Sequence, residues 1–433
     1  MGSPPAATEK TKNQGRELDY RRGLCYESPW PLSRNSSHYG ADISLTGPRN
    51  TARISPDGRP RIVLTWCACG RISRYPAMPV RPGGVTKGVR MALFDTENEF
   101  IEWLRTRASR RNHGIKAGVG DDAAVLAFGP GQEVLLKSDM SIEGVHFTTG
   151  LHPPTSVGHR ALARPLSDIA AMGGTPKFAL VAISLSAHTT RSWLESFYDG
   201  LLALAVQSGV ALVGGDTAVV SGAITIDVVV AGEVGPGTAL LRSGARPGDA
   251  VYISGWPGAS AMGLQLIVGR PHHPRGSLIR PRGKSTTAPV RAPLTTRHAI
   301  HAHLYPEPRL ALGRYLLEHR LASAAMDISD GISTDLGRLA AASGVGAIIR
   351  QGCLPKPEIG RPDWTPLALH GGEDYELLFT VSPDKVPLVP RTFQGVPLNR
   401  IGEITKSKRL RLVGSDGKER DLEPAGYDHF RKT

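Results

Sequence analysis

Six short acidic segments constrain the fold of this 433-residue chain more than any other feature. Most of them follow a short apolar run and contain glycine or serine, which is typical of the turn at the end of a strand. Glycines let phosphates approach the backbone closely, and carboxylates can hold the metal ions that neutralise a transferring phosphoryl group. Together the segments indicate metal-dependent phosphoryl transfer; they are Gly120-Asp121-Asp122, Ser138-Asp139, Ser167-Asp168, Gly215-Asp216, Asp327-Ile328-Ser329-Asp330-Gly331 and Gly371-Gly372-Glu373-Asp374.

The first two of these segments lie close together in the chain. Val125–Phe128 and Val134–Lys137 are predicted strands, and the turn residues Gly129-Pro130-Gly131 favour a hairpin that brings Asp121-Asp122 near Ser138-Asp139. Two carboxylates about 4 Å apart repel by roughly 1 kcal/mol in water and about 4 kcal/mol at a partly buried site, so their convergence implies bound cations. Magnesium suits such oxygen ligands. The alternative for an isolated Asp-Asp pair is a loop or a helix cap.

The order of predicted elements indicates an α+β or α/β fold. Thr96, with Glu99 three residues later, is typical of a helix N-terminus. In the helix predicted over 155–172, Pro165 implies either a kink or a late start. The remaining predicted helices are 191–208, 259–268, 310–318 and 333–342, and the remaining strands are 178–185, 210–213, 224–234, 250–254, 324–328, 376–381 and 401–404.

The length suggests two or three domains. Residues 1–90 are rich in Gly, Pro, Ser and Arg and lack apolar periodicity, so we expect a disordered basic extension there. A first domain is expected over 91–240 and a second over 241–433, with a basic inserted loop at about 270–300. Met91 begins the patterned sequence, and we expect residues 91–433 to suffice for folding and activity.

The net charge of +13 does not by itself indicate a nucleic-acid partner. Residues 1–90 carry +9 and residues 270–300 carry +7, which leaves −3 for the rest of the chain. A solvated tail and a solvated loop are the favoured interpretation. No stretch approaches the roughly 20 apolar residues that span a membrane. Of the four cysteines only Cys353 lies beyond residue 90, which favours a reducing, cytoplasmic location.

The order and context of these motifs resemble the thiamine-monophosphate kinase family of the aminoimidazole-ribonucleotide-synthetase superfamily. The similar segments cover about residues 91–433 apart from the basic insert, and they are GVGDDAAVL, SDMSIEGVHF, PLSDIAAMGGTP, LVGGDT, LRSGARPGD, DISDGISTDL, GGEDYELLF and GYDHF. The resemblance implies an N-terminal domain whose sheet pairs with a second subunit in a homodimer. It also implies a C-terminal α/β domain, with ATP bound between the two domains.

The implied reaction is direct transfer of the ATP γ-phosphoryl group to thiamine monophosphate. Carried over residue by residue, the family's ATP contacts fall on Gly215, Arg242 and Ser329, and its thiamine-phosphate contacts fall on His146, Glu373 and Tyr427. Its Mg²⁺ ligands fall on Asp122, Ser138, Asp139, Asp168, Asp216, Asp327 and Asp330. Without the motifs, His146 would be interpreted as a buried core histidine and Tyr427 as a packing residue.

Two departures from the family pattern affect this assignment. Lys137 stands where some relatives have a hydroxyl residue that touches metal, and Arg164-Pro165 stands where relatives usually have small or amide residues. Three alternatives remain open. One is another ATP-using enzyme of the superfamily, such as a formylglycinamidine-type synthetase, a selenophosphate synthetase or a hydrogenase-maturation dehydratase. The others are a protein that binds nucleic acid through its basic tail and a non-catalytic family member.

Overall fold

The structure, a computed structural model, describes residues 94, 96–108, 114–119, 124–269, 295–356 and 364–427, all within the unit Thr86–Thr433. The predicted basic extension over 1–90 lies outside these residues, as does most of the predicted insert. The described end of that insert is helical from Thr296 onward. Among the described helices, none has the length and apolar character needed to cross a membrane.

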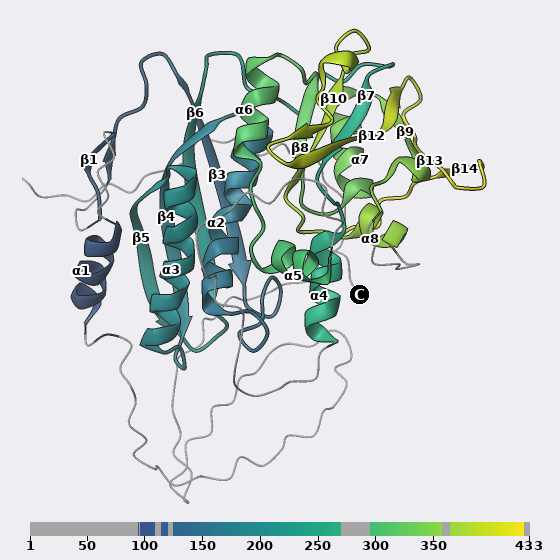
Figure 1. Cartoon of the computed structure of the whole chain (residues 1–433). Helices are drawn as coiled ribbons and strands as arrows, with labels where there is room; N and C mark the ends of the chain where they lie inside the picture. Colours follow the sequence, from purple (N-terminus) through teal and green to yellow (C-terminus); the bar gives the residue numbers. More distant parts are fainter. Residues whose placement is uncertain are drawn as a thin grey trace, which may run out of the picture. The chain divides into compact units, whose positions relative to one another are not determined.

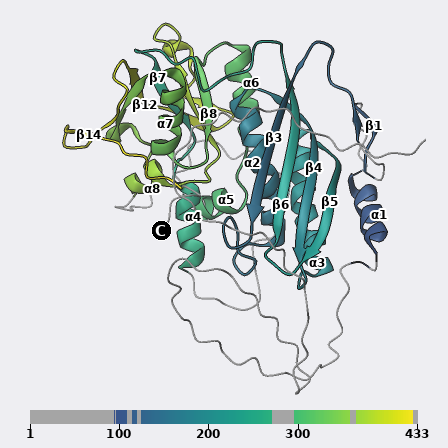
Figure 2. The same cartoon turned by 180° about the vertical axis from the view of Figure 1, so that it is seen from behind.

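The first half of the described chain forms a four-stranded sheet in the order β3-β6-β4-β5. Strand β6 is antiparallel to β3 and β4, whereas β4 and β5 are parallel. Helices α2 and α3 cover one face of this sheet (Figure 1). In the view from behind, the sheet lies in front of the two helices and shows its other face (Figure 2). The elements are β3 (Glu133–Ile142), α2 (Pro154–Ala171), β4 (Thr175–Ser186), α3 (Arg191–Ser208), β5 (Ala211–Val220) and β6 (Thr225–Val234).

Helix α3 has the ends that its sequence predicts. The side chain of Thr190 accepts a hydrogen bond from the backbone N–H of Trp193, which satisfies a donor of the first turn. Gly209 ends the helix at φ 72°, a left-handed conformation that glycine adopts without strain. The interval 191–208 predicted from the sequence is therefore confirmed.

Helix α2 is buried on most of its sides. It starts at Pro154 and continues through Pro165, so the late start considered above does not occur. Its packing against α3 is very close, because a Cβ built on Gly158 would lie 1.9 Å from the carbonyl oxygen of Phe197. A Cβ on Gly200 would likewise lie 1.9 Å from the carbonyl oxygen of Thr155. Glycines at these positions allow the two helix backbones to touch.

The second half forms a mixed sheet in the order β14-β13-β9-β12-β7-β10-β8, with β11 paired to β12. Its strands are β7 (Ala250–Ser254), β8 (Ala324–Ile328), β9 (Gly346–Arg350), β10 (Glu376–Val381), β11 (Thr392–Phe393), β12 (Val396–Thr405), β13 (Leu410–Val413) and β14 (Glu419–Asp421). Its helices are α4 (Ala259–Val268), α5 (Thr296–Leu304), α6 (Leu310–Glu318), α7 (Ile332–Ser343) and α8 (Trp364–His370), with two 3₁₀ turns, η1 (Gln351–Cys353) and η2 (Val386–Leu388).

The central strands of this second sheet are covered on both faces. Val251 and Ile253 of β7 join one apolar core, and Ala250 and Tyr252 join another. The second of these cores also contains Ala170-Ala171 from the end of α2. Helix α2 is thus packed between the two sheets, and it connects the two halves of the fold.

The predicted hairpin between the first two acidic segments is wrong. Strand β2 (Val125–Leu126) pairs with β1 (Ile115–Ala117), while β3 pairs with β6 about 90 residues later in the chain. The β1–β2 pair packs on part of the face of the first sheet that the helices leave uncovered, where Phe128 contacts Phe178 edge to face. Helix α1 (Glu97–Ala108) precedes β1, and Thr96 accepts a hydrogen bond from the backbone N–H of Glu99 as predicted.

Candidate active site

Helix α2 supplies one stripe of charged side chains to the space between the sheets. Arg160, Arg164 and Asp168 are spaced four residues apart, so they lie on the same side of the helix, and Ser167 lies beside the last of them. The stripe passes β3 on one side and β8 on the other, because α2 contacts both strands. Residues from three elements therefore meet here.

Three aspartates, which we call the acidic group, lie near one another, and two of them contact an amine. They are Asp139 of β3, Asp168 of α2 and Asp327 of β8. The Nζ atom of Lys137 lies 3.1 Å from Oδ2 of Asp168 and 3.6 Å from Oδ2 of Asp139. Asp327 is 3% exposed and accepts a hydrogen bond of 2.8 Å from the hydroxyl of Ser167. The structure thus brings together three of the predicted metal ligands.

Burial and mutual repulsion disfavour the ionised form of two of these carboxyl groups. Burial raises the pKa of Asp327 to about 8, and the neighbouring Asp168 raises it further against the hydrogen bond from Ser167. Burial also raises the pKa of Asp139 to about 6, although Lys137 and Arg164 act in the opposite direction. For Lys137 burial lowers the pKa, but Asp168 and Asp139 outweigh it, so the pKa is raised and the amine stays charged.

The turn after β8 carries Ser329 and Asp330, and it is held by a buried carboxylate. The Oδ2 atom of Asp335 accepts hydrogen bonds from the backbone N–H groups of Ser329, at 3.0 Å, and Asp330, at 2.9 Å. Arg338 pairs with both Asp330 and Asp335. Gly331 follows at φ 102°, and a Cβ there would lie 2.8 Å from the carbonyl carbon of His370.

Tyr427 lies next to the Ser329-Asp330 turn, because the preceding residue, Gly426, packs against that turn. A Cβ on Gly426 would lie 2.0 Å from the carbonyl oxygen of Asp330, so the backbones are in close contact. The N–H of Gly426 also donates to the hydroxyl of Thr334 at 3.1 Å. The side chain of Tyr427 is 52% exposed.

Glu373 lies in a backbone loop of unusual conformation. Glu373 and Tyr375 have φ values of 65° and 54°, which for residues other than glycine typically cost on the order of 1–3 kcal/mol each. Their N–H groups donate to the carbonyls of Ser329 and Ile328, at 2.6 and 2.9 Å, which holds the loop against the end of β8. Backbone strain of this kind is common at functional sites.

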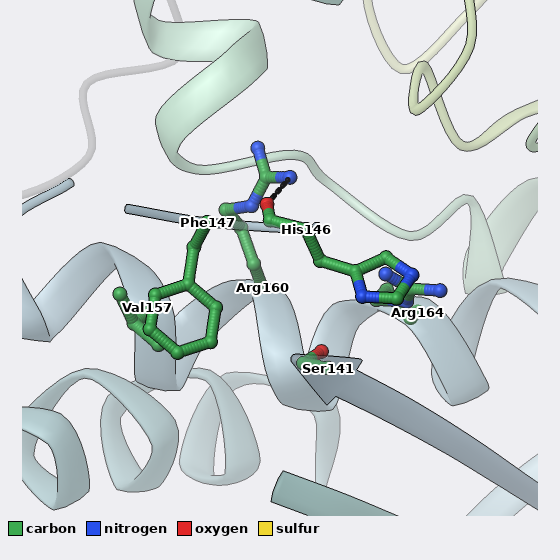
Figure 3. A pocket seen from close by; sticks show the side chains of 6 residues that line it. All are labelled: Ser141, His146, Phe147, Val157, Arg160 and Arg164. Atoms are coloured by element: carbon green, nitrogen blue, oxygen red, sulfur yellow. Dashed lines mark hydrogen bonds between the residues drawn. The ribbon is translucent and has the colours of Figure 1, made fainter. Parts of the chain in front are cut away.

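The Glu373 carboxylate forms an ion pair with Arg160, whose side chain is 4% exposed. Burial raises the pKa of Glu373, but Arg160 and Arg164 outweigh it and lower the pKa to about 2, so this carboxylate stays ionised. Arg160 also donates to the carbonyl oxygens of His146 and His303. A small pocket lies at this point (Figure 3), lined by Ser141, His146, Phe147, Val157, Arg160 and Arg164.

The remaining predicted site residues lie elsewhere. Ser138 and Asp216 are on the opposite face of the first sheet from Asp139, because successive strand residues alternate between faces. There the Ser138 hydroxyl donates to Asp227 at 2.7 Å. Gly215 is adjacent to Asp216 on β5, and a Cβ on it would lie 1.9 Å from the carbonyl oxygen of Val181.

Arg242 and Asp122 are the last two predicted site residues. Arg242 is exposed and lies near the start of β8, since the neighbouring carbonyl of Leu241 accepts a hydrogen bond from Ala325. Ser329 follows the other end of the same strand. Asp122 falls outside the described residues.

The sequence interpretation did not assign a role to Arg160 or Asp335. The four-residue spacing of Arg160, Arg164 and Asp168 within a predicted helix was available as a signal. Asp335, five residues after Asp330, resembled an ordinary polar residue of a first helical turn. Its contacts with the preceding turn required the fold.

The acidic group suits a hard divalent cation such as Mg²⁺. Its donors are carboxylate oxygens, and the buried Asp327 and Asp139 would gain from a positive charge that favours their ionised forms. Within the described ranges, no three His, Cys, Asp or Glu side chains are already arranged around one ion position. Mg²⁺ does not require such a set, because it is commonly bound by one or two carboxylates, water and substrate phosphates.

Comparison with known proteins gives a consistent result across most of the chain. Residues 120–234 match the N-terminal domain of AIR synthase related proteins, and residues 246–415 match the C-terminal domain. The thiamine-monophosphate kinase of Bacillus subtilis (strain 168) is 35% identical over 324 residues, which are 73% of this chain and 94% of that protein.

Two solved structures are also similar. The crystal structure of thiamine-monophosphate kinase from Stenotrophomonas maltophilia K279a is 34% identical with a TM-score of 0.61, over 74% of this chain and 96% of that one. AaThiL complexed with AMPPCP and TMP is 29% identical with a TM-score of 0.57, over 77% and 97% of the respective chains. This chain therefore belongs to the thiamine-monophosphate kinase family and has the two domains of an AIR synthase related protein.

Proposed function

We propose that this protein transfers the γ-phosphoryl group of ATP to thiamine monophosphate and so produces thiamine diphosphate and ADP. The observation that carries the proposal is that α2 joins an acidic group suited to metal-bound phosphates with a pocket that contains His146 and borders the ionised Glu373. The family relationship and the relative complexed with AMPPCP and TMP support it.

Each part of the site has a role in this reaction. Asp139, Asp168 and Asp327 would hold Mg²⁺, which when bound neutralises charge on the phosphates. An oxygen of the acceptor phosphate attacks the γ-phosphorus, the bond from that phosphorus to the bridging oxygen breaks, and its electron pair leaves with ADP. The attacking oxygen is already ionised, so the site needs no strong general base, and positioning carries catalysis.

Charged side chains around the site orient the two substrates. Lys137 balances the acidic group on the side of β3. Glu373 remains ionised and provides a counter-charge for the cationic ring of thiamine. We assign the nucleotide contacts to Gly215, Arg242 and Ser329, and further metal contacts to Asp122, Ser138, Asp216 and Asp330. We assign contact with the thiamine cation to Tyr427, which is 52% exposed, together with His146.

We further propose a homodimer formed through the uncovered face of the first sheet, acting in the cytoplasm. The supporting observation is an apolar group on that face, namely Val134, Leu136, Met140 and Leu180, which are 47%, 72%, 49% and 39% exposed. We place the domain boundary near residue 240, since the two matched domain ranges end at 234 and begin at 246.

The direct test is an assay of the purified protein with ATP, Mg²⁺ and either thiamine monophosphate or thiamine. We expect ADP and thiamine diphosphate to form in equal amounts from the monophosphate and not from thiamine. Analysis of the products by liquid chromatography distinguishes the two acceptors. Conversion of thiamine alone, or ATP hydrolysis without a phosphorylated product, would refute the proposed reaction.

A further inference from the structure

Arg164 is the least satisfied charged group of the site. It lies one helical turn after Arg160 and one before Asp168, and it lines the pocket shown in Figure 3 together with Ser141 and His146. Its side chain is only 14% exposed. A guanidinium group removed from water to this extent normally has hydrogen-bond acceptors for its N–H groups.

Among the described residues, Nε and Nη1 of Arg164 have no hydrogen-bond partner. Its closest carboxylate atoms are Oε1 of Glu373, 3.7 Å from Nη1, and Oδ1 of Asp139, 3.9 Å from Nη2. Both contacts are close enough to be ion pairs, but both are longer than a hydrogen bond. Arg160 on the same helix differs, because it donates to Glu373 and to two backbone carbonyls.

The position of Arg164 indicates which anion it binds. It lies between Asp139, which belongs to the acidic group, and Glu373, which stays ionised beside the pocket. A ligand that carries both a phosphate and a cationic ring can place the phosphate against Arg164 and the ring near Glu373. Thiamine monophosphate has both charges, whereas ATP has no cationic ring.

We propose that Arg164 binds the phosphate of the acceptor through paired hydrogen bonds and thereby selects thiamine monophosphate over unphosphorylated thiamine. This inference rests on the proposed function. A planar guanidinium suits two phosphate oxygens, and such charge-assisted pairs are stronger than neutral hydrogen bonds. The unsatisfied N–H groups of Arg164 would obtain their acceptors when the substrate binds.

The test compares Arg164→Met, which removes the charge, with Arg164→Lys, which keeps the charge but loses the paired donors. Calorimetric titration with thiamine monophosphate, in the presence of Mg²⁺ and a non-hydrolysable ATP analogue, gives the acceptor Kd. We expect Arg164→Met to weaken acceptor binding by about 30-fold or more and Arg164→Lys to weaken it less. The inhibition constant of thiamine and the Kd of the ATP analogue should change less than about 3-fold.

A matched variant, Arg350→Met, removes an exposed arginine whose ion pair with Glu403 spans 3.8 Å, and it should leave every constant unchanged. Equal weakening of thiamine and its monophosphate would overturn the inference, because it would indicate a structural role. Weakening confined to the ATP analogue would also overturn it and assign Arg164 to the donor phosphate. If Arg164→Met does not fold, Arg164→Lys alone decides, since unchanged monophosphate binding in that variant refutes paired recognition.

Failure of the proposed function would look different. In that case the unmodified protein would neither bind nor phosphorylate thiamine monophosphate, whatever residue stands at position 164. An unmodified protein that does phosphorylate it, together with an Arg164→Met variant of unchanged acceptor Kd, would refute only the role of Arg164.

Discussion

Single carboxylates of this site owe their positions to hydrogen bonds with buried neighbours, some local in the chain and some distant. Asp335, which is completely buried, fixes the turn that carries Asp330, and Ser167 fixes Asp327. Burial raises the pKa of Asp335 to about 6 against the hydrogen bond from the Asp330 backbone.

Replacing Asp139 or Asp330 by asparagine should abolish most turnover and leave the fold intact. Each change keeps the size of the side chain but removes a charge that would neutralise a metal ion, so we expect turnover to fall by about 100-fold or more. Steady-state assays over a range of Mg²⁺ concentrations, with circular dichroism of each variant, provide the measurement. An exposed Asp416→Asn variant is the control. Near-normal turnover in both site variants would remove the metal assignment.

His159 should make stability dependent on pH. Burial lowers the pKa of His159 to about 4, although its contact with the carbonyl of Pro306 at 2.8 Å opposes the shift. In the unfolded chain the ring titrates near pH 6.5, so the unfolded state binds more protons between pH 6.5 and 4. Stability contributed by the neutral ring is therefore lost as the pH falls through this window.

Urea unfolding at pH 7 and pH 5 would measure this effect. We expect the free energy of unfolding to fall by about 1–2 kcal/mol more in the unmodified protein than in a His159→Gln variant. The other ionisable groups are common to both proteins, so the difference between them isolates His159. Parallel pH profiles would contradict the expectation.

The sequence could predict the acidic residues of the site because their motifs are local and recognisable. The motifs predict Asp139, Asp168 and Asp327 as metal ligands, and the fold brings these three residues near one another; their role as ligands stays a prediction. The arginines around the acidic group were harder to predict, because Arg160 and Glu373, which form an ion pair, are 213 positions apart in the sequence. Whether Ser138 and Asp216, on the other sheet face, share the site stays a prediction.

The bounds of helices and central strands agree with the sequence prediction where local sequence signals define them. The predicted bounds of α4, α6, β7, β8 and β10 are confirmed, because an apolar run marks each one. Several missed elements have weaker local signals: α5 is rich in histidine, α8 contains a proline, and β13 and β14 have only four and three residues. The hairpin prediction failed since strand pairing at long range overrode a strong local turn signal.

Close packing of α2 on α3 makes Gly200→Ala an informative variant. Alanine normally stabilises a helix interior by about 1 kcal/mol relative to glycine. Here the new methyl group would meet the backbone of Thr155, so we expect a net loss of about 3 kcal/mol or more in the free energy of unfolding. Thermal and urea unfolding measure it. Gly352→Ala, with open space around the position, is the control. Equal stability of the two variants would refute the packing argument.

For the whole molecule, the uncovered sheet face predicts the oligomeric state. Leu136→Asp places a charge at the most exposed apolar position of β3 and should convert the proposed dimer into a monomer. Light scattering coupled to size-exclusion chromatography measures the mass. Leu388→Asp changes a leucine that is 64% exposed on η2, and it should leave the dimer intact. A monomeric unmodified protein, or a dimeric Leu136→Asp variant, would contradict this interface.

The contacts of Arg160 limit how the two halves can move. One buried guanidinium donates to the loop before α2, to the end of α5 and to the loop before β10. Swinging the halves apart would break its bonds to His303 and Glu373 and leave this cation with the His146 carbonyl as its acceptor, a cost of several kcal/mol. We therefore expect nucleotide and vitamin to enter and leave through movements of surface segments, while the framework around α2 stays closed throughout the catalytic cycle.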